Sequence, residues 1–275
     1  AGVVITEKPV YEYVPLSTND GNPVCQYQMT TLEELGLLKM DFLGLRNLTV
    51  LDDAVKLVQK TVPDFRIEDA PEDDKATYEM LAAGRTSGVF QLESTGMTGV
   101  CVGLKPKSIE DITALIALYR PGPMDSIPRF LECSVHPEKV SYKHELLRPI
   151  LSVTYGCIVY QEQVIEIFRR LAGFSLGQAD MIRRAMSKKK MDVMEKERKN
   201  FIYGSGEENI PGALKSGVDE KSVGEVFDEM IDFAKYAFNK SHATVYALVA
   251  YQTAYLKRFY PMEFMAAMLT SEQGN

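Results

Sequence analysis

The chain has 275 residues, of which 45% are hydrophobic and 25% are charged. This composition is typical of a globular protein and excludes a disordered, collagen-like or coiled-coil chain. The length can bury a core without disulfides or metals and indicates one large domain or two modest ones. The formal net charge of -7, taken as a whole, disfavours binding to DNA or to an acidic membrane surface.

Membrane and export segments are not expected. No segment has the roughly 20 consecutive apolar residues that a transmembrane helix needs, and the N-terminus lacks the basic leader and apolar core of a signal peptide. The chain begins at Ala1, within what reads as strand sequence, so we expect a piece of a longer protein. The cysteines are far apart, without the spacing of a zinc site, which is typical of reduced, cytosolic residues. They are Cys25, Cys101, Cys133 and Cys157.

The first 45 residues predict strands. Polar and apolar residues alternate over residues 24–29, after a turn at residues 19–23. A second strand is expected over residues 37–43. Alternate residues of a strand share a face, so Lys39 and Asp41 should lie side by side.

From about Arg46 onward the pattern is helical, with apolar residues at helical spacing. The sequence therefore predicts a mostly α fold with a small β portion (α+β), divided into residues 1–45 and 46–275. Ser108 and Ser241 are expected as helix N-caps, Ser108 with Asp111 in a capping box. Helices are expected near residues 47–60, 73–83, 108–119, 160–172, 175–188, 191–202, 219–236 and 241–259.

The common nucleotide and metal motifs are missing from the sequence. It contains neither the phosphate-binding loop G-x-x-x-x-G-K-[ST] nor a G-x-G-x-x-G after a strand. It contains no H-E-x-x-H and no D-x-D pair, and its three histidines do not cluster. The remaining candidates for a functional site are three other groups of residues.

The first such group is Lys39 with Asp41. In the simpler interpretation the two residues form a surface ion pair. In the alternative, Asp41 binds a metal ion at a strand end and Lys39 faces a phosphate. Two-metal phosphoryl transfer requires several carboxylates, of which Asp41 is one.

The second group is the basic run from Arg183 to Lys190. On a helix, Arg184 and Lys188 share a face at a spacing of four residues. The run could be a solvated helix end, where positive charge is favoured by the helix dipole. It could also bind phosphate, because guanidinium groups fit phosphate oxygens in a bidentate manner and lysine adds a point charge.

The third group lies at the start of the last long helix, in the run Phe238-Asn239-Lys240-Ser241-His242. It could form a helix cap alone, or a cap together with an anion site formed by the helix N-terminus, Lys240 and His242. Three further segments, residues 91–94, 120–123 and 155–163, are interpreted as turns and helix starts.

Taken together, these segments resemble a known family, the alpha subunit of bacterial DNA polymerase III, a C-family replicative polymerase, in its DnaE type. The ordered set covers nearly the whole chain and is far more specific than any one run. The FNKSH form resembles the DnaE branch rather than the PolC branch. The matching runs, in family order, are LLKMDFLGLRNLTVL, GVFQLESTGM, LYRPGPM, YGCIVYQEQV, GQADMIRRAMSKKK, FNKSHATVYALVAYQTAYLK and YPMEFMAA.

The resemblance implies a DNA-directed DNA polymerase of bacterial chromosome replication, which adds deoxynucleotides to a primer 3′ end by two-metal (Mg²⁺) nucleotidyl transfer. Asp41 matches the family's third catalytic aspartate, a metal ligand, and Lys39 matches a lysine near the primer terminus. Residues 1–45 would be the C-terminal part of a palm domain and residues 46–275 part of a fingers domain. The nucleotide-binding residues that the resemblance implies are Arg183, Arg184, Lys188, Lys240 and His242.

The resemblance also implies partners and a location. Primer–template DNA and deoxynucleoside triphosphates would bind the parent enzyme in the bacterial cytoplasm, at the nucleoid and not at a membrane. The sliding clamp, clamp loader and a proofreading exonuclease subunit would bind regions absent from this chain. The family's D-x-D segment is also absent, so we expect an incomplete Mg²⁺ site and an inactive fragment. The alternatives are a non-catalytic helical adaptor and a phosphotransferase that acts on a small nucleotide.

Overall fold

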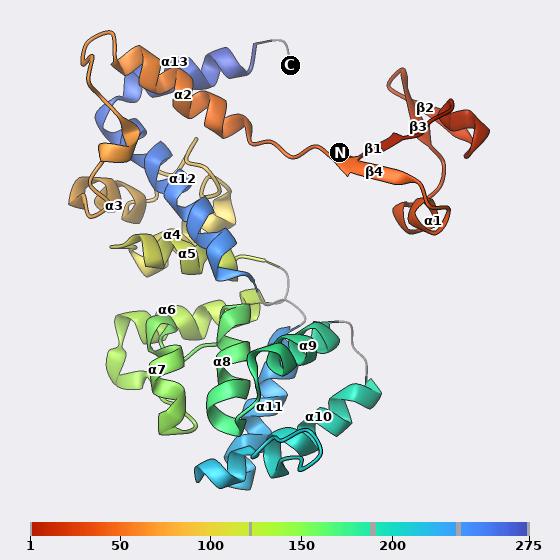
Figure 1. Ribbon diagram of the computed structural model, residues 1–275. Helices are drawn as coiled ribbons and strands as arrows, with labels where there is room; N and C mark the ends of the chain where they lie inside the picture. The colour runs from red at the N-terminus through yellow and green to blue at the C-terminus, as the bar shows by residue number, and fades with distance from the viewer. Residues whose placement is uncertain (1, 121–122, 188–190, 235–237, 274–275) are drawn as a thin grey trace. The chain divides into compact units, whose positions relative to one another are not determined.

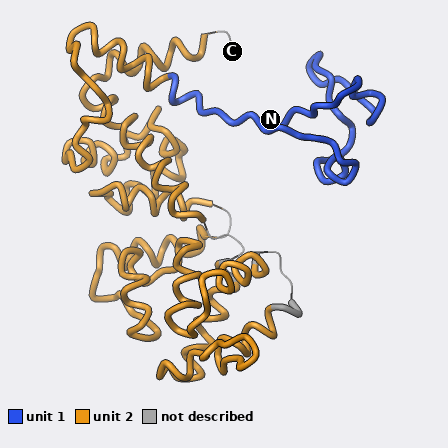
Figure 2. The backbone as a smooth tube through the Cα atoms, in the orientation of Figure 1, with its two compact units in different colours: residues 1–49 blue, residues 50–275 orange. Residues whose placement is uncertain are grey.

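The chain folds into two compact units, residues 1–49 (unit 1) and residues 50–275 (unit 2), coloured separately in Figure 2. The structure, a computed structural model, describes all residues except 1, 121–122, 188–190, 235–237 and 274–275. In the described part the named strands all lie in unit 1, and unit 2 is helical (Figure 1). The predicted fold class, mostly α with a small β portion, is confirmed.

Unit 1 contains two antiparallel pairs of strands. The first strand pairs with the last, and the two middle strands form a hairpin whose turn includes Gly21. Gly21 has a φ of +79°, a left-handed conformation that glycine adopts without steric cost. The elements of unit 1 are β1 (Gly2–Ile5), β2 (Leu16–Asn19), β3 (Asn22–Cys25), α1 (Met29–Glu34) and β4 (Leu38–Asp41).

The strand predicted at residues 24–29 is shorter in the structure. β3 ends at Cys25, and Met29 already begins α1. The partner strand β2 begins after Pro15, which has no backbone N–H to extend the ladder. Gln26 instead closes the hairpin, because both its backbone N–H and its side-chain amide donate to carbonyls at the start of β2, each over 3.0 Å. The alternating pattern therefore continues past the last paired residue.

The first part of unit 2 is arranged around the long helix α12, which packs against α5, α3 and α13 (Figure 1). Contacts with distant parts of the chain hold it in place: the buried Thr253 hydroxyl accepts a hydrogen bond of 3.1 Å from the N–H of Phe90. The helices of this part are α2 (Arg46–Val58, which begins in unit 1), α3 (Lys75–Ala82), α4 (Thr95–Leu104), α5 (Ile109–Leu118), α12 (Lys240–Phe259) and α13 (Pro261–Ser271).

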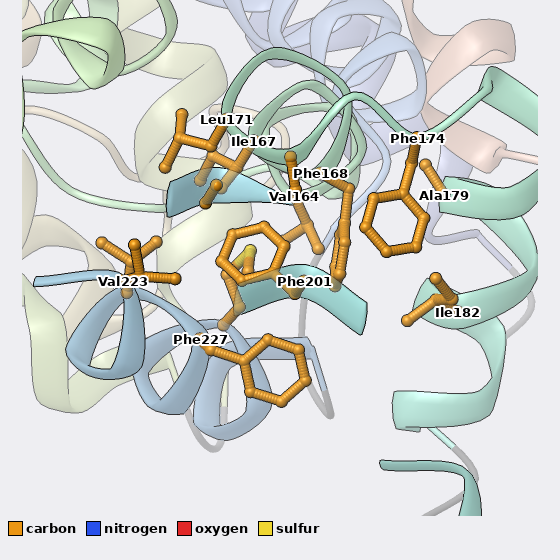
Figure 3. Close-up of a cluster of buried hydrophobic side chains, with 14 of the residues drawn as sticks. Val164, Ile167, Phe168, Leu171, Phe174, Ala179, Ile182, Phe201, Val223 and Phe227 are labelled. Atoms are coloured by element: carbon orange, nitrogen blue, oxygen red, sulfur yellow. The ribbon is translucent and has the colours of Figure 1, made fainter. Parts of the chain in front are cut away.

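The second part of unit 2 contains a large apolar core. Phe168 on α8 lies edge-on to Phe201, with ring centroids 5.0 Å apart, and Phe227 lies 5.5 Å from Phe201 (Figure 3). Such inclined aromatic contacts stabilise a core beyond the burial of their area. The helices of this part are α6 (Ile127–Val135), α7 (Arg148–Leu151), α8 (Gln161–Ala172), α9 (Leu176–Ser187), α10 (Met191–Tyr203) and α11 (Glu220–Ala234).

The observed helices α2, α3, α5 and α8 to α12 lie close to their predicted bounds, but the structure differs from the prediction in the capping box of α5 and in the cap of α12. Ser108 caps α5 as expected, accepting from the N–H of Asp111 over 3.2 Å. The carboxylate of Asp111, however, accepts from the N–H of Lys107 rather than from Ser108, so the capping box is displaced by one residue. For α12 the predicted cap, Ser241, is wrong, and Asn239 caps the helix instead.

Among the described residues, no helix combines the length and the apolar character needed to cross a membrane.

Candidate functional site

Lys39 and Asp41 lie side by side on β4, as the strand periodicity predicts. The ammonium group of Lys39 donates to both carboxylate oxygens of Asp41, over 2.7 and 2.9 Å. Gly2 faces Asp41 across the β1–β4 pair, and a Cβ at Gly2 would lie 2.8 Å from a carboxylate oxygen. A glycine at this register position therefore leaves room for the Lys39–Asp41 pair above the sheet.

The residues around Asp41 do not by themselves fit a two-metal site. Within the described ranges, no group of three or more His, Cys, Asp or Glu side chains could hold a metal ion. Asp41 offers one half-exposed carboxylate, and the ammonium of Lys39 contacts both of its oxygens. Asp41 can thus provide one carboxylate of such a site.

Arg183 and Arg184 lie next to each other on α9, and Asp180 binds both. The Nη2 of Arg183 is 2.9 Å from one carboxylate oxygen of Asp180, and the Nε of Arg184 is 2.9 Å from the other. The hydrogen bonds from Arg183 and the charges of both arginines hold the pKa of Asp180 below its ordinary value, so the carboxylate is ionised at neutral pH. Lys188, expected on the same helix face, lies outside the described residues.

The start of α12 presents His242 in an aromatic stack. The imidazole ring lies 4.3 Å from the ring of Tyr246 and stacks on it, and it meets Phe238 edge-on at 5.2 Å. The guanidinium of Arg120 lies 3.6 Å from the centre of the Phe238 ring. The position of His242 is thus fixed by aromatic neighbours and by its N–H, which donates to the Asn239 side chain over 2.8 Å.

Lys240, two residues before His242, is held by acidic and aromatic groups. Its ammonium lies 2.6 Å from a carboxylate oxygen of Glu110 on α5 and 5.3 Å from the ring centre of Tyr160. Its backbone N–H donates to Glu162 over 3.0 Å. Tyr160 is buried, and burial raises the pKa of its hydroxyl. Lys240 therefore links the beginnings of α5, α8 and α12 at one point.

The sequence interpretation missed two residues of this arrangement. Asp180 precedes Arg183 and Arg184 by three and four residues, the spacing at which helical side chains meet, so its role could have been recognised. Arg120 was assigned to a turn, because nothing in the sequence brings residue 120 next to residue 238.

Residues 47–209 match the model of the bacterial DNA polymerase III alpha subunit finger domain, and residues 1–44 match that of the bacterial DNA polymerase III alpha NTPase domain. The DNA polymerase III subunit alpha of Thermus aquaticus is 49% identical, over 99% of this chain and 22% of that protein. The subunits of Borreliella burgdorferi and Bacillus subtilis are 48% and 47% identical, over 100% of this chain and 24% of each protein.

The chain therefore spans about a quarter, or slightly less, of the length of the curated relatives that it matches. The match to the finger-domain model covers more than half of the chain and includes the arginine pair of α9. On these grounds, the chain belongs to the bacterial DNA polymerase III alpha subunit family.

Proposed function

We propose that this chain is the part of a bacterial DNA polymerase that binds the triphosphate of the incoming deoxynucleotide. The observation that supports the proposal is the pair Arg183 and Arg184, drawn together on α9 within the region that matches the finger-domain model. Residues 1–45 would then be the end of the palm domain, and residues 46–275 part of the fingers domain.

The proposed chemistry is nucleotidyl transfer from a deoxynucleoside triphosphate to a primer. The primer 3′-hydroxyl loses its proton and attacks the α-phosphorus. The new O–P bond replaces the bond between the α-phosphorus and the α–β bridging oxygen, and pyrophosphate leaves with that oxygen. Guanidinium groups suit the pyrophosphate end of the substrate, because their planar N–H groups match phosphate oxygens and their charge offsets the charge of the leaving group. Arg183 and Arg184 would take this role together with Lys188, while Lys240 and His242 would border the same pocket.

Asp41 and Lys39 would belong to the reacting end of the substrate. We propose that Asp41 contributes one carboxylate to a Mg²⁺ site whose other ligands are not among the described residues. Lys39 would place its positive charge near the primer terminus and, in the state described here, neutralises Asp41.

The partners follow from the proposed polymerase activity. Primer–template DNA and deoxynucleoside triphosphates would be the substrates, and the enzyme would act at the bacterial nucleoid, in the cytoplasm. The sliding clamp, the clamp loader and a proofreading exonuclease subunit would bind the full-length protein outside this segment.

The proposal is tested by Arg184→Ala in the full-length polymerase. Loss of one preorganised cationic donor should lower kcat/KM for each nucleotide on the order of 10²-fold. Steady-state primer extension with all four nucleotides measures the effect. Arg170→Ala is the matched control, because Arg170 also contacts an acid one turn earlier through its Nε, over 2.9 Å, but lies on α8. Unchanged kinetics in Arg184→Ala for all four nucleotides would remove the proposed role.

A further inference from the structure

The arginine pair on α9 poses a geometric problem for binding one phosphate group. Consecutive residues of an α-helix point about 100° apart. The two side chains should therefore diverge, and two guanidinium groups brought together repel each other. A paired site needs a group that draws both side chains to one side and offsets part of their charge.

Asp180 has the position and the contacts for this role. It lies three residues before Arg183 and four before Arg184, so its carboxylate stands between them on the helix surface. One carboxylate oxygen accepts from Nε and Nη2 of Arg183, over 3.1 and 2.9 Å. The other oxygen lies 2.9 Å from Nε of Arg184. A single carboxylate thus bridges both guanidinium groups.

The two arginines differ in how far they are covered. The side chain of Arg183 is only 15% exposed and gives two nitrogen atoms to Asp180, so its orientation is fixed. The side chain of Arg184 is 69% exposed and contacts Asp180 through Nε. Asp180 itself is partly exposed, at 31%.

We propose that Asp180 is a positioning residue, which converges Arg183 and Arg184 into one unit for binding the triphosphate of the incoming nucleotide. This inference rests on the proposed function of the arginine pair and adds a residue to it. Asp180 does not touch the nucleotide, because an anion beside phosphate would be repelled. It acts by fixing Arg183 and by holding Arg184 on the same side of α9.

The neighbouring helix α8 provides an internal comparison. Glu166 bridges Arg169 and Arg170 at the same spacings of three and four residues, and its side chain is also 31% exposed. The two acidic bridges are alike in sequence spacing and in exposure. They should contribute alike to the stability of their helices, and only the bridge on α9 should influence nucleotide binding.

The test compares Asp180→Asn with Glu166→Gln in the full-length polymerase, by steady-state primer extension. Asp180→Asn keeps the shape of the side chain and removes its charge. We expect it to raise the nucleotide KM on the order of 10-fold, by analogy with the loss of groups that orient ligands at other sites. The KM for primer–template DNA should not change. Glu166→Gln should leave both KM values unchanged. Asp180→Asn and Glu166→Gln should lower the melting temperature by similar small amounts.

A third variant, Asp180→Glu, separates positioning from folding. Glu166 shows that a glutamate can bridge two arginines at this spacing, so Asp180→Glu should recover most of the nucleotide affinity. If Asp180→Asn fails to fold, an Asp180→Glu protein with a nucleotide KM near that of the parent supports the proposal, and one with a KM raised as far as in Arg184→Ala overturns it.

The possible outcomes separate this inference from the function on which it rests. If Arg184→Ala lowers kcat/KM for the nucleotides and Asp180→Asn behaves like Glu166→Gln, the bridge only stabilises the helix and the inference is wrong. A lower nucleotide KM in Asp180→Asn would make Asp180 a competitor of phosphate, which also overturns it. If Arg184→Ala leaves kcat/KM for all four nucleotides unchanged, the proposed function itself fails.

Discussion

At the scale of single residues, Gln163 shows how one side chain can organise the start of a helix. Its amide oxygen accepts from the N–H groups of Val159 and Tyr160, over 2.7 and 2.9 Å. Its amide nitrogen donates to the carbonyl of Ile150 and the hydroxyl of Thr154, over 3.2 and 2.7 Å. Gln163 is buried, so each of these bonds replaces a bond to water that is unavailable there.

We predict that Gln163→Leu destabilises the protein strongly. The substitution leaves two buried N–H groups without a partner, and each costs about 1–3 kcal/mol. The control is Gln178→Leu, because Gln178 stands at the matching position of α9 and is partly exposed. It accepts from the N–H of Ser175 over 2.9 Å and donates to the carbonyl of Glu208 over 3.1 Å. Water can reach these partners, so the cost should be about 1 kcal/mol. Denaturant unfolding of the chain measures both values, and equal free energies of unfolding for the two variants would contradict the burial argument.

Part of the candidate site could be predicted at this scale, and part could not. The alternation of a strand was enough to place Lys39 beside Asp41, because the relation is local. The spacing of three and four residues on a helix was also enough to predict that Asp180 bridges the two arginines. The contact of Arg120 with Phe238 could not be derived, because it depends on how α5 and α12 pack, and no local periodicity encodes that.

At the scale of elements, α4 was missed because its sequence disfavours a helix. It contains Gly96, Gly99 and Gly103, and each glycine costs a helix interior about 1 kcal/mol relative to alanine. Tertiary packing accounts for at least one of them. A Cβ at Gly96 would lie 1.8 Å from the hydroxyl oxygen of Tyr119, so only glycine permits this close approach. The helix is selected by its neighbours, against its local propensity.

The start of α12 was misplaced for a related reason. Asparagine and serine are about equally good caps, so the sequence could not choose between Asn239 and Ser241. Contacts outside the helix make the choice. Asn239 donates to Glu162 over 2.7 Å, and the chain next to it forms a β-bridge between Phe238 and Tyr160.

We predict that Asn239→Ala destabilises the protein by about 1 kcal/mol, because the N–H of His242 loses its cap. The control is Ser241→Ala, at an exposed position within the first turn, which should change stability by less than about 0.5 kcal/mol. Chemical denaturation with matched slopes compares the two. A larger loss in Ser241→Ala than in Asn239→Ala would restore Ser241 as the cap.

At the scale of the whole molecule, the two units differ in how much they bury. In the described part of unit 1, only Val14 and Leu32 are fully buried. One face of the β1–β4 pair, which includes Val3 and Met40, remains substantially exposed. Unit 2 contains the extended core of Figure 3. The strand that carries Asp41 therefore lies in the unit with less internal support, whereas the arginine pair lies in the unit with more.

For phosphate binding, the location of charge matters more than the net charge of the chain. The net charge of -7 alone disfavours a nucleic-acid enzyme, yet the chain belongs to a DNA polymerase family. Membership of this family favours the proposed role in a polymerase over the alternatives of an adaptor or a small-nucleotide phosphotransferase. A local pair such as Arg183 and Arg184 sets the field that a bound phosphate experiences, since exposed charges farther away than about 8 Å are largely screened at physiological salt.

The last prediction is that the 275-residue chain alone does not extend a primer. Two-metal phosphoryl transfer needs several carboxylates around the ions, and Asp41, which is bound to Lys39, provides one. Purified chain with Mg²⁺, primer–template DNA and all four nucleotides should give no product, while the full-length polymerase gives product under the same conditions. Circular dichroism should show the helical content of unit 2, so that inactivity is not caused by unfolding. Templated extension by the folded chain would mean that its own carboxylates complete the metal site. The proposal that Asp41 shares this site with ligands from outside the chain would then be wrong.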